Sequence, residues 1–76
     1  MDVFVRLGRA YISINKIESI YIDESKDRVV ICMLSQIKHN FEPGNGENLE
    51  EILEDIHSKI RKAQYDFTKS IQNKST

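Results

Sequence analysis

An apolar seam in the C-terminal third constrains this chain more than any other feature. Its members are separated by four, three, four, three and four residues: Leu49, Leu53, Ile56, Ile60, Ala63 and Phe67. This spacing predicts one long amphipathic helix over about residues 48–71, with Ile71 continuing the apolar face. Because the repeat is a heptad, the seam is also suited to packing against a second helix.

The predicted helix is longer than any strand that precedes it. From Leu49 to Ile71 it spans roughly 34 Å, whereas a strand of about six residues spans about 20 Å. A sheet then covers the seam to about Ile60. We expect the remainder to pack against another subunit, with interface candidates Ile60, Ala63, Phe67 and Ile71. The alternative is a bent or frayed end that folds back on its own sheet.

The segment before the helix, Gly44-Asn45-Gly46, resembles a phosphate-binding loop in its glycine content only. Its spacing fits neither the dinucleotide fingerprint nor the P-loop. The acidic residues Glu47, Glu50 and Glu51 occupy the place of an anion. Asn48 and Glu51 have capping-box spacing. The sequence therefore predicts a turn and a capped helix start.

Residues 2–42 show the period-two alternation of short strands, with a tight turn expected at Gly8-Arg9. The run Val29–Leu34 is apolar at every position, which predicts a central strand covered on both faces. The fold class expected is α+β: one antiparallel sheet of four to five strands in a meander, followed by the helix. We expect a single domain over residues 1–72 and a polar tail over 73–76.

A chain of 76 residues buries only about 60% of its unfolded surface. Its single cysteine, Cys32, cannot form an intrachain disulfide. Cys32, His39 and His57 lack the spacing of metal ligands, and neither histidine accompanies a nucleophile motif. We therefore expect no metal, no cofactor and no catalytic residues, and we expect self-association to supply the missing stability.

The charge balance also limits the expected partners. A net charge of −1 argues against general nucleic-acid binding. No apolar run approaches the length of a membrane span, so no membrane partner is expected. A free cysteine without an export signal is typical of a cytoplasmic protein.

The strand pattern predicts a second, aromatic face on the sheet. Phe4, Arg6, Tyr11, Ser13 and Tyr21 alternate with an aliphatic set that the helix should cover. Such residues favour a subunit interface. They also suit the stacking of a planar, nucleotide-sized ligand between subunits, with Arg9 and Arg61 as further binding candidates.

Residues 5–57 resemble the short FlbD-like flagellar proteins in the order "RLGRAYISINKIESI", "VVICMLSQIKHNFEPGNGENLEEILEDI". The matching positions are Leu7, Asn15, Ile17, Glu18, Ile20, Ile31, Leu34, Leu49, Ile52 and Ile56. The resemblance implies a small sheet closed by a helix. It departs from the family where Ser35-Gln36 replaces the usual Asn-Gly turn, and where the helix continues past the family's usual end.

These observations predict a non-catalytic binding or regulatory protein that acts as a homo-oligomer, with itself or another protein as partner. One alternative is a protein that sequesters or senses a nucleotide-sized ligand between subunits. The other is a nucleic-acid-binding regulator.

Overall fold

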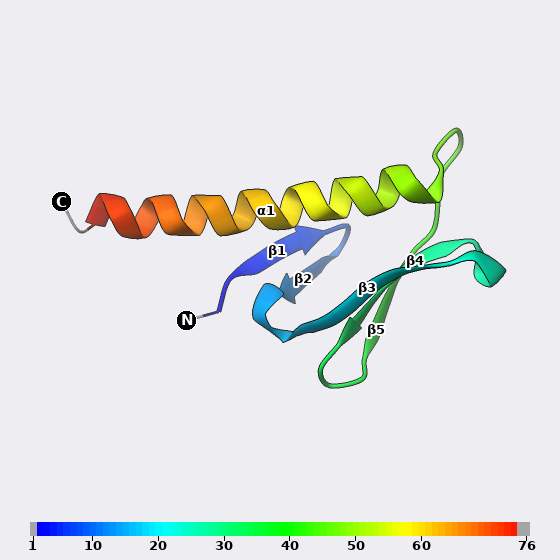
Figure 1. The fold of residues 1–76 in the computed structure, drawn as a ribbon, viewed down its shortest axis with the longest axis horizontal. Helices are drawn as coiled ribbons and strands as arrows, with labels where there is room; N and C mark the ends of the chain where they lie inside the picture. The colour runs from blue at the N-terminus through cyan, green and yellow to red at the C-terminus, as the bar shows by residue number, and fades with distance from the viewer. Residues whose placement is uncertain (1, 75–76) are drawn as a thin grey trace.

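Five short strands and one long helix make up the fold (Figure 1). The computed structural model describes the backbone of residues 2–74 and the side chains of residues 2–69. The elements in chain order are β1 (Phe4–Leu7), β2 (Ala10–Ser13), β3 (Ile17–Asp23), β4 (Arg28–Met33), β5 (Lys38–Phe41) and α1 (Leu49–Lys74). The predicted α+β class, with antiparallel strands and one C-terminal helix, is confirmed.

The expectation of a single sheet is wrong, because the strands form two sheets. β1 and β2 make a two-stranded hairpin, and β3, β4 and β5 make a separate three-stranded meander. A 3₁₀ turn, Ile14–Lys16, lies between them. The Ile14 N–H donates to Val3 O at 2.8 Å, whereas Lys16 O accepts from the Leu34 N–H at 2.8 Å. The turn thus bonds at one end to the residue before β1 and at the other end to the residue after β4, and β3 pairs with β4 instead of β2.

The core lies where the two sheets and α1 meet. Its buried members come from the hairpin (Val5, Leu7, Ile12), from β4 (Val29, Ile31, Met33) and from α1 (Ile56). Because the two sheets contribute to one cluster, they pack against each other through these inner faces. The outer faces of the two sheets therefore point to different sides of the molecule.

Strand β4 is the centre of the meander, as its continuous apolar run predicted. All residues from Val29 to Met33 are buried, including Val30 and Cys32, which lie outside the main core cluster. Leu34 departs from this prediction, because it is 58% exposed. The strand ends at Met33, whose O accepts from the Gln36 N–H at 2.9 Å, and Leu34 therefore belongs to the turn.

Two loops show how the strand register is fixed. The Gly8-Arg9 turn is confirmed: Leu7 pairs with Ala10, and Gly8 has a φ of 64°, which glycine adopts at little cost. The β4–β5 loop contains Leu34, Ser35 and Gln36 instead of the two residues expected, because the Met33 N–H donates to Ile37 O at 2.9 Å. Gln36 takes a left-handed φ of 75° to close it.

Helix α1 lies across the hairpin, and its C-terminal end projects beyond both sheets (Figure 1). It runs to Lys74, past the expected end at residue 71. The molecule is consequently elongated, with principal extents of 49 × 29 × 18 Å.

Candidate functional site

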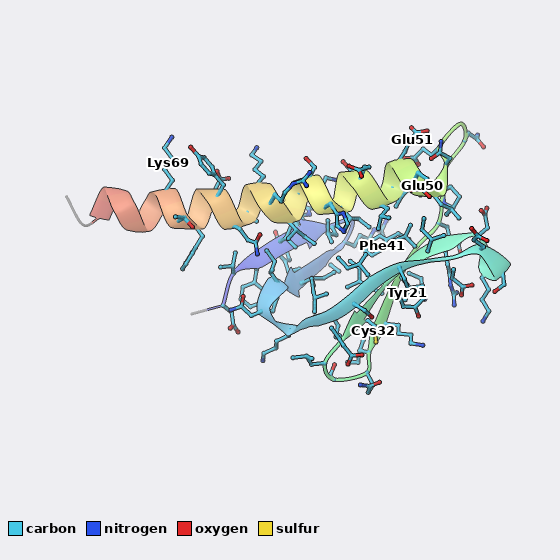
Figure 2. The ribbon with its side chains drawn as sticks, in the orientation of Figure 1. Tyr21, Cys32, Phe41, Glu50, Glu51 and Lys69 are labelled. Carbon is cyan, nitrogen blue, oxygen red and sulfur yellow. The ribbon has the colours of Figure 1, made fainter. Side chains whose placement is uncertain are left out.

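The start of α1 is a capped helix start, which confirms the prediction from its sequence. Asn48 Oδ1 accepts from the Glu51 N–H at 2.9 Å, and Asn48 Nδ2 donates to Glu51 Oε1 at 2.7 Å. The Gly44 N–H donates to Glu47 Oε1 at 2.9 Å. Figure 2 shows Glu50 beside Glu51 on this first turn. The amides of Gly44 and Glu51 are therefore occupied by side-chain oxygens of the chain itself and are not available to a phosphate.

The apolar seam of α1 packs further along the helix than the length argument predicted. Ile56 is 3% exposed, and Ile60 and Ala63 are partly buried against the core. A single strand would reach only about Ile60, but α1 contacts β1 as well as β3 and β4. Two interface candidates, Ile60 and Ala63, are thus already packed against their own chain.

The seam continues past this contact at Phe67. Phe67 is half-buried, but among the described side chains it is not one of those packed against the core cluster. The Ile71 side chain, also nominated for the interface, lies outside the described residues. Among the described side chains of the seam, Phe67 is therefore the one that does not pack against the core cluster.

The outer face of the hairpin brings together three of the predicted binding residues. Phe4 is 57% exposed and Tyr11 is 71% exposed. Arg6 pairs across the strands with Tyr11, and its guanidinium carbon lies 6.0 Å from the centre of the tyrosine ring. Arg6 Nε also donates to Gly8 O at 3.2 Å. The hydrogen bond and the cation–π contact, which lies at the outer limit of its range, favour a guanidinium position beside the tyrosine ring.

The continuous aromatic face expected from sequence is divided by the two-sheet architecture. Tyr21 pairs with Val30 on the outer face of the meander, whereas Phe41 on the other face points toward α1 (Figure 2). Tyr21 therefore lies away from Arg6 and Tyr11. Ser13, expected on the aromatic face, is only 8% exposed, and its Oγ has no hydrogen-bond partner among the described residues.

Arg9 and Arg61 lie at two further places. Arg61 borders a shallow depression on α1 together with Glu50, Glu54 and Asp55. Arg9 borders a groove of about 590 Å³ between the β1–β2 turn and β5. Within one chain, the residues nominated for a nucleotide-sized ligand are therefore not gathered into one pocket.

The groove beside β5 was not predicted from sequence. It is lined by Leu7, Gly8, Arg9, Ala10, Lys38, His39, Asn40, Phe41 and Glu42. In the sequence "KHNFE", Lys38 and Glu42 have opposite charges at equal distances from Asn40, and this charge pattern was the available signal. It indicates a binding surface only once the pairing of β5 is known.

One carboxyl group has a displaced pKa. The Ser25 hydroxyl donates to Asp23 Oδ1 at 2.7 Å, and this bond is the main reason that the Asp23 pKa lies below its ordinary value of 3.8. Arg28 Nε, at 3.9 Å from Asp23 Oδ2, lowers the pKa further. These residues stabilise the turn between β3 and β4, where Asp27 has a left-handed φ of 52°.

Among the described residues, no group of three or more His, Cys, Asp or Glu side chains is arranged to hold a metal ion. None of the helices formed by residues 2–74 combines the length and apolar character that crossing a bilayer requires. No family model, curated protein or solved structure matches the chain.

Proposed function

We propose that this chain is a non-catalytic binding protein that works as a homo-oligomer, with the projecting end of α1 covered by α1 of a second copy. The observation that carries the proposal is the position of Phe67. It follows Ala63, which packs against the core, in the same heptad seam, yet it is not among the described residues packed there.

A second copy of α1 suits this segment because the seam is self-complementary in size. An antiparallel pair with its two-fold axis between positions 63 and 67 places each Phe67 opposite Ala63 of the second copy, which is only partly buried against its own core. A large side chain then meets a small one in both contacts, which is how well-packed helix pairs fill space. Heptad spacing is also the spacing that keeps a seam facing a partner helix.

The free energy of association that this contact supplies is large enough to measure as a change in the dissociation constant. Fully burying a phenylalanine side chain is worth about 1.5–3 kcal/mol. Phe67 is already half-buried within its own chain, so each ring gains about half of this, and removing both should cost about 1.5–3 kcal/mol, or roughly tenfold to a hundredfold in the dissociation constant.

Phe67→Ser tests the proposal, with Tyr65→Ser as its matched control. Tyr65 is an aromatic residue on the same helix that is 64% exposed and lies off the seam. Sedimentation velocity over a range of concentrations should show Phe67→Ser dissociating at concentrations where the parent and Tyr65→Ser remain assembled. The proposal fails if the parent is monomeric throughout, or if both variants behave like the parent.

The hairpin face is the proposed contact surface for a partner protein. Tyrosine and arginine are among the residue types that dominate binding energy in protein interfaces, and phenylalanine is enriched there. The Arg6–Tyr11 contact reduces the ordering cost of binding. Because Tyr11 is 71% exposed, Tyr11→Ala should reduce partner binding with little change in the unfolding midpoint. A large loss of stability would instead make Tyr11 a structural residue.

The ligand alternative rests on the same Arg6–Tyr11 pair, since a planar anion would stack on the ring and pair with the guanidinium. A ligand at 100 times its dissociation constant adds about 2.7 kcal/mol of stability. Thermal-shift measurements with purine and pyrimidine nucleotides, repeated on Tyr11→Ala, would distinguish it from protein binding.

A further inference from the structure

Strand β5 has one edge that is free of pairing within the described chain. It pairs with β4 alone, and the Met33 N–H donates to Ile37 O at the start of the ladder. Antiparallel bonds alternate, so His39 and Phe41 bond to β4. The backbone N–H and C=O groups of Lys38 and Asn40, and by continuation those of Glu42, then point away from the sheet.

This edge differs from the opposite edge of the meander. β3 has an irregularity between Ile17 and Ser19 in its pairing with β4, and bulges of this kind bend an edge away from further pairing. The β4–β5 register from Cys32↔Lys38 to Val29↔Phe41 has no such shift. The regular edge of the meander is therefore β5.

We propose that β5 pairs in antiparallel fashion with β5 of a second copy, about a two-fold axis at Asn40. In this register Asn40 lies opposite its own copy, and each Lys38 lies opposite Glu42 of the second copy. Lys38, Asn40 and Glu42, whose backbone groups point outward, then pair with the same three residues of the second copy. Both Lys38–Glu42 pairs are attractive. A register centred on Lys38 would instead place two lysines together.

The surface beside the edge has space for this pairing. The groove of about 590 Å³ lies between β5 and the β1–β2 turn, and the half-buried His39 and Phe41 border it. The inner side chains of a second β5 would enter this space. Pro43, which has no N–H, follows directly and limits the paired segment to about Lys38–Glu42.

The pairing goes beyond the α1 contact proposed above and does not depend on it. It joins two meanders into one six-stranded sheet and leaves no β5 edge open, because a two-fold contact closes on itself. The partner is therefore a second copy of this chain, chosen by the complementarity of Lys38 and Glu42.

Reciprocal charge changes test the register directly. K38E places acids opposite acids, and E42K places lysines opposite lysines, so each variant alone should associate about tenfold more weakly than the parent. An equimolar mixture restores two attractive pairs and should associate as the parent does. Each experiment is made in the parent and in the Phe67→Ser background, so that loss of the α1 contact and loss of the β5 contact are scored separately.

The matched control is the pair K62E and E54K, which makes the same changes in net charge on exposed positions of α1. Their mixture should gain no association over the separate variants. The β5 proposal is overturned if the K38E and E42K mixture associates no better than each variant alone, or if the control mixture gains as much.

Amide hydrogen exchange gives a second readout that needs no substitution. His39 and Phe41 should be protected at every protein concentration, since their N–H groups bond to β4. Asn40 should become protected only as concentration rises and β5 pairs. Asn40 exchange that is independent of concentration across a range in which the chain assembles would refute the proposed register.

Discussion

Replacing Ile56 with alanine tests whether α1 holds the two sheets together. Ile56 is the buried α1 residue among the described side chains, at 3% exposure, and it belongs to the cluster that contains Leu7 and Ile31. The substitution removes about three carbon atoms, worth roughly 0.8 kcal/mol each in lost burial. The cavity left behind adds to this, so the total cost should be about 3–4 kcal/mol, within the range for isoleucine-to-alanine changes in cores.

That cost is large for this chain. A domain of 76 residues with about 0.05–0.15 kcal/mol per residue has a free energy of unfolding of about 4–11 kcal/mol. Ile56→Ala should therefore remove between about a quarter and all of the stability.

Urea unfolding followed by circular dichroism, at one fixed protein concentration, measures the effect. The control is Ile37→Ala, because Ile37 is the same residue type but is 60% exposed. It should change the free energy of unfolding by no more than about 0.5 kcal/mol. Equal costs for the two substitutions, or a cost below about 1 kcal/mol for Ile56→Ala, would refute the packing of α1 described above.

Three further predictions concern the turns and the cap. Asn48→Ala should cost about 0.5–2 kcal/mol in urea unfolding, because the Glu51 N–H loses its acceptor; an unchanged value would contradict the cap. Gln36→Gly should raise the free energy of unfolding by up to about 1 kcal/mol, since glycine avoids the left-handed penalty at this position, whereas Gln36→Val should lower it. The lowered pKa of Asp23 contributes stability above pH 3.8 that is lost as pH falls through the folded-state value. Carboxyl NMR titration should show Ser25→Ala raising that pKa toward 3.8, and no change would contradict the hydrogen bond as its cause.

The elements with strong local signals could be predicted from sequence. The heptad spacing located α1, the Asn48–Glu51 pair marked its start, and the apolar run identified β4. Each of these signals depends on residues close together in the chain. Local capping and packing preferences were therefore enough to determine them.

The division into two sheets could not be predicted in the same way. β2 and β3 both alternate apolar and polar residues, and this alternation does not specify which strands pair. Pairing was decided by the 3₁₀ turn at Ile14–Lys16 and by the contacts of Lys16 with Leu34, which are distant in sequence. The predicted aromatic face failed for the same reason, since it assumed that Tyr11 and Tyr21 belong to one sheet.

The register of β5 depended on a finer detail, the length of the loop before it. Leu34 adds one residue to the expected Ser35-Gln36 turn, and Gln36, in a left-handed conformation, closes the longer loop. A two-residue turn would have placed each β5 residue opposite a different residue of β4.

The late position of α1 in the chain has a consequence for folding. The hairpin and the meander each form from contacts between neighbouring strands, but their shared apolar surface also packs against Ile56. During synthesis, residues up to Phe41 are made before α1. Val5, Ile12 and Ile31 therefore stay partly uncovered until α1 packs against them. Such partly covered intermediates are prone to aggregation. The rate at which α1 docks therefore sets how long a newly made chain remains prone to aggregation.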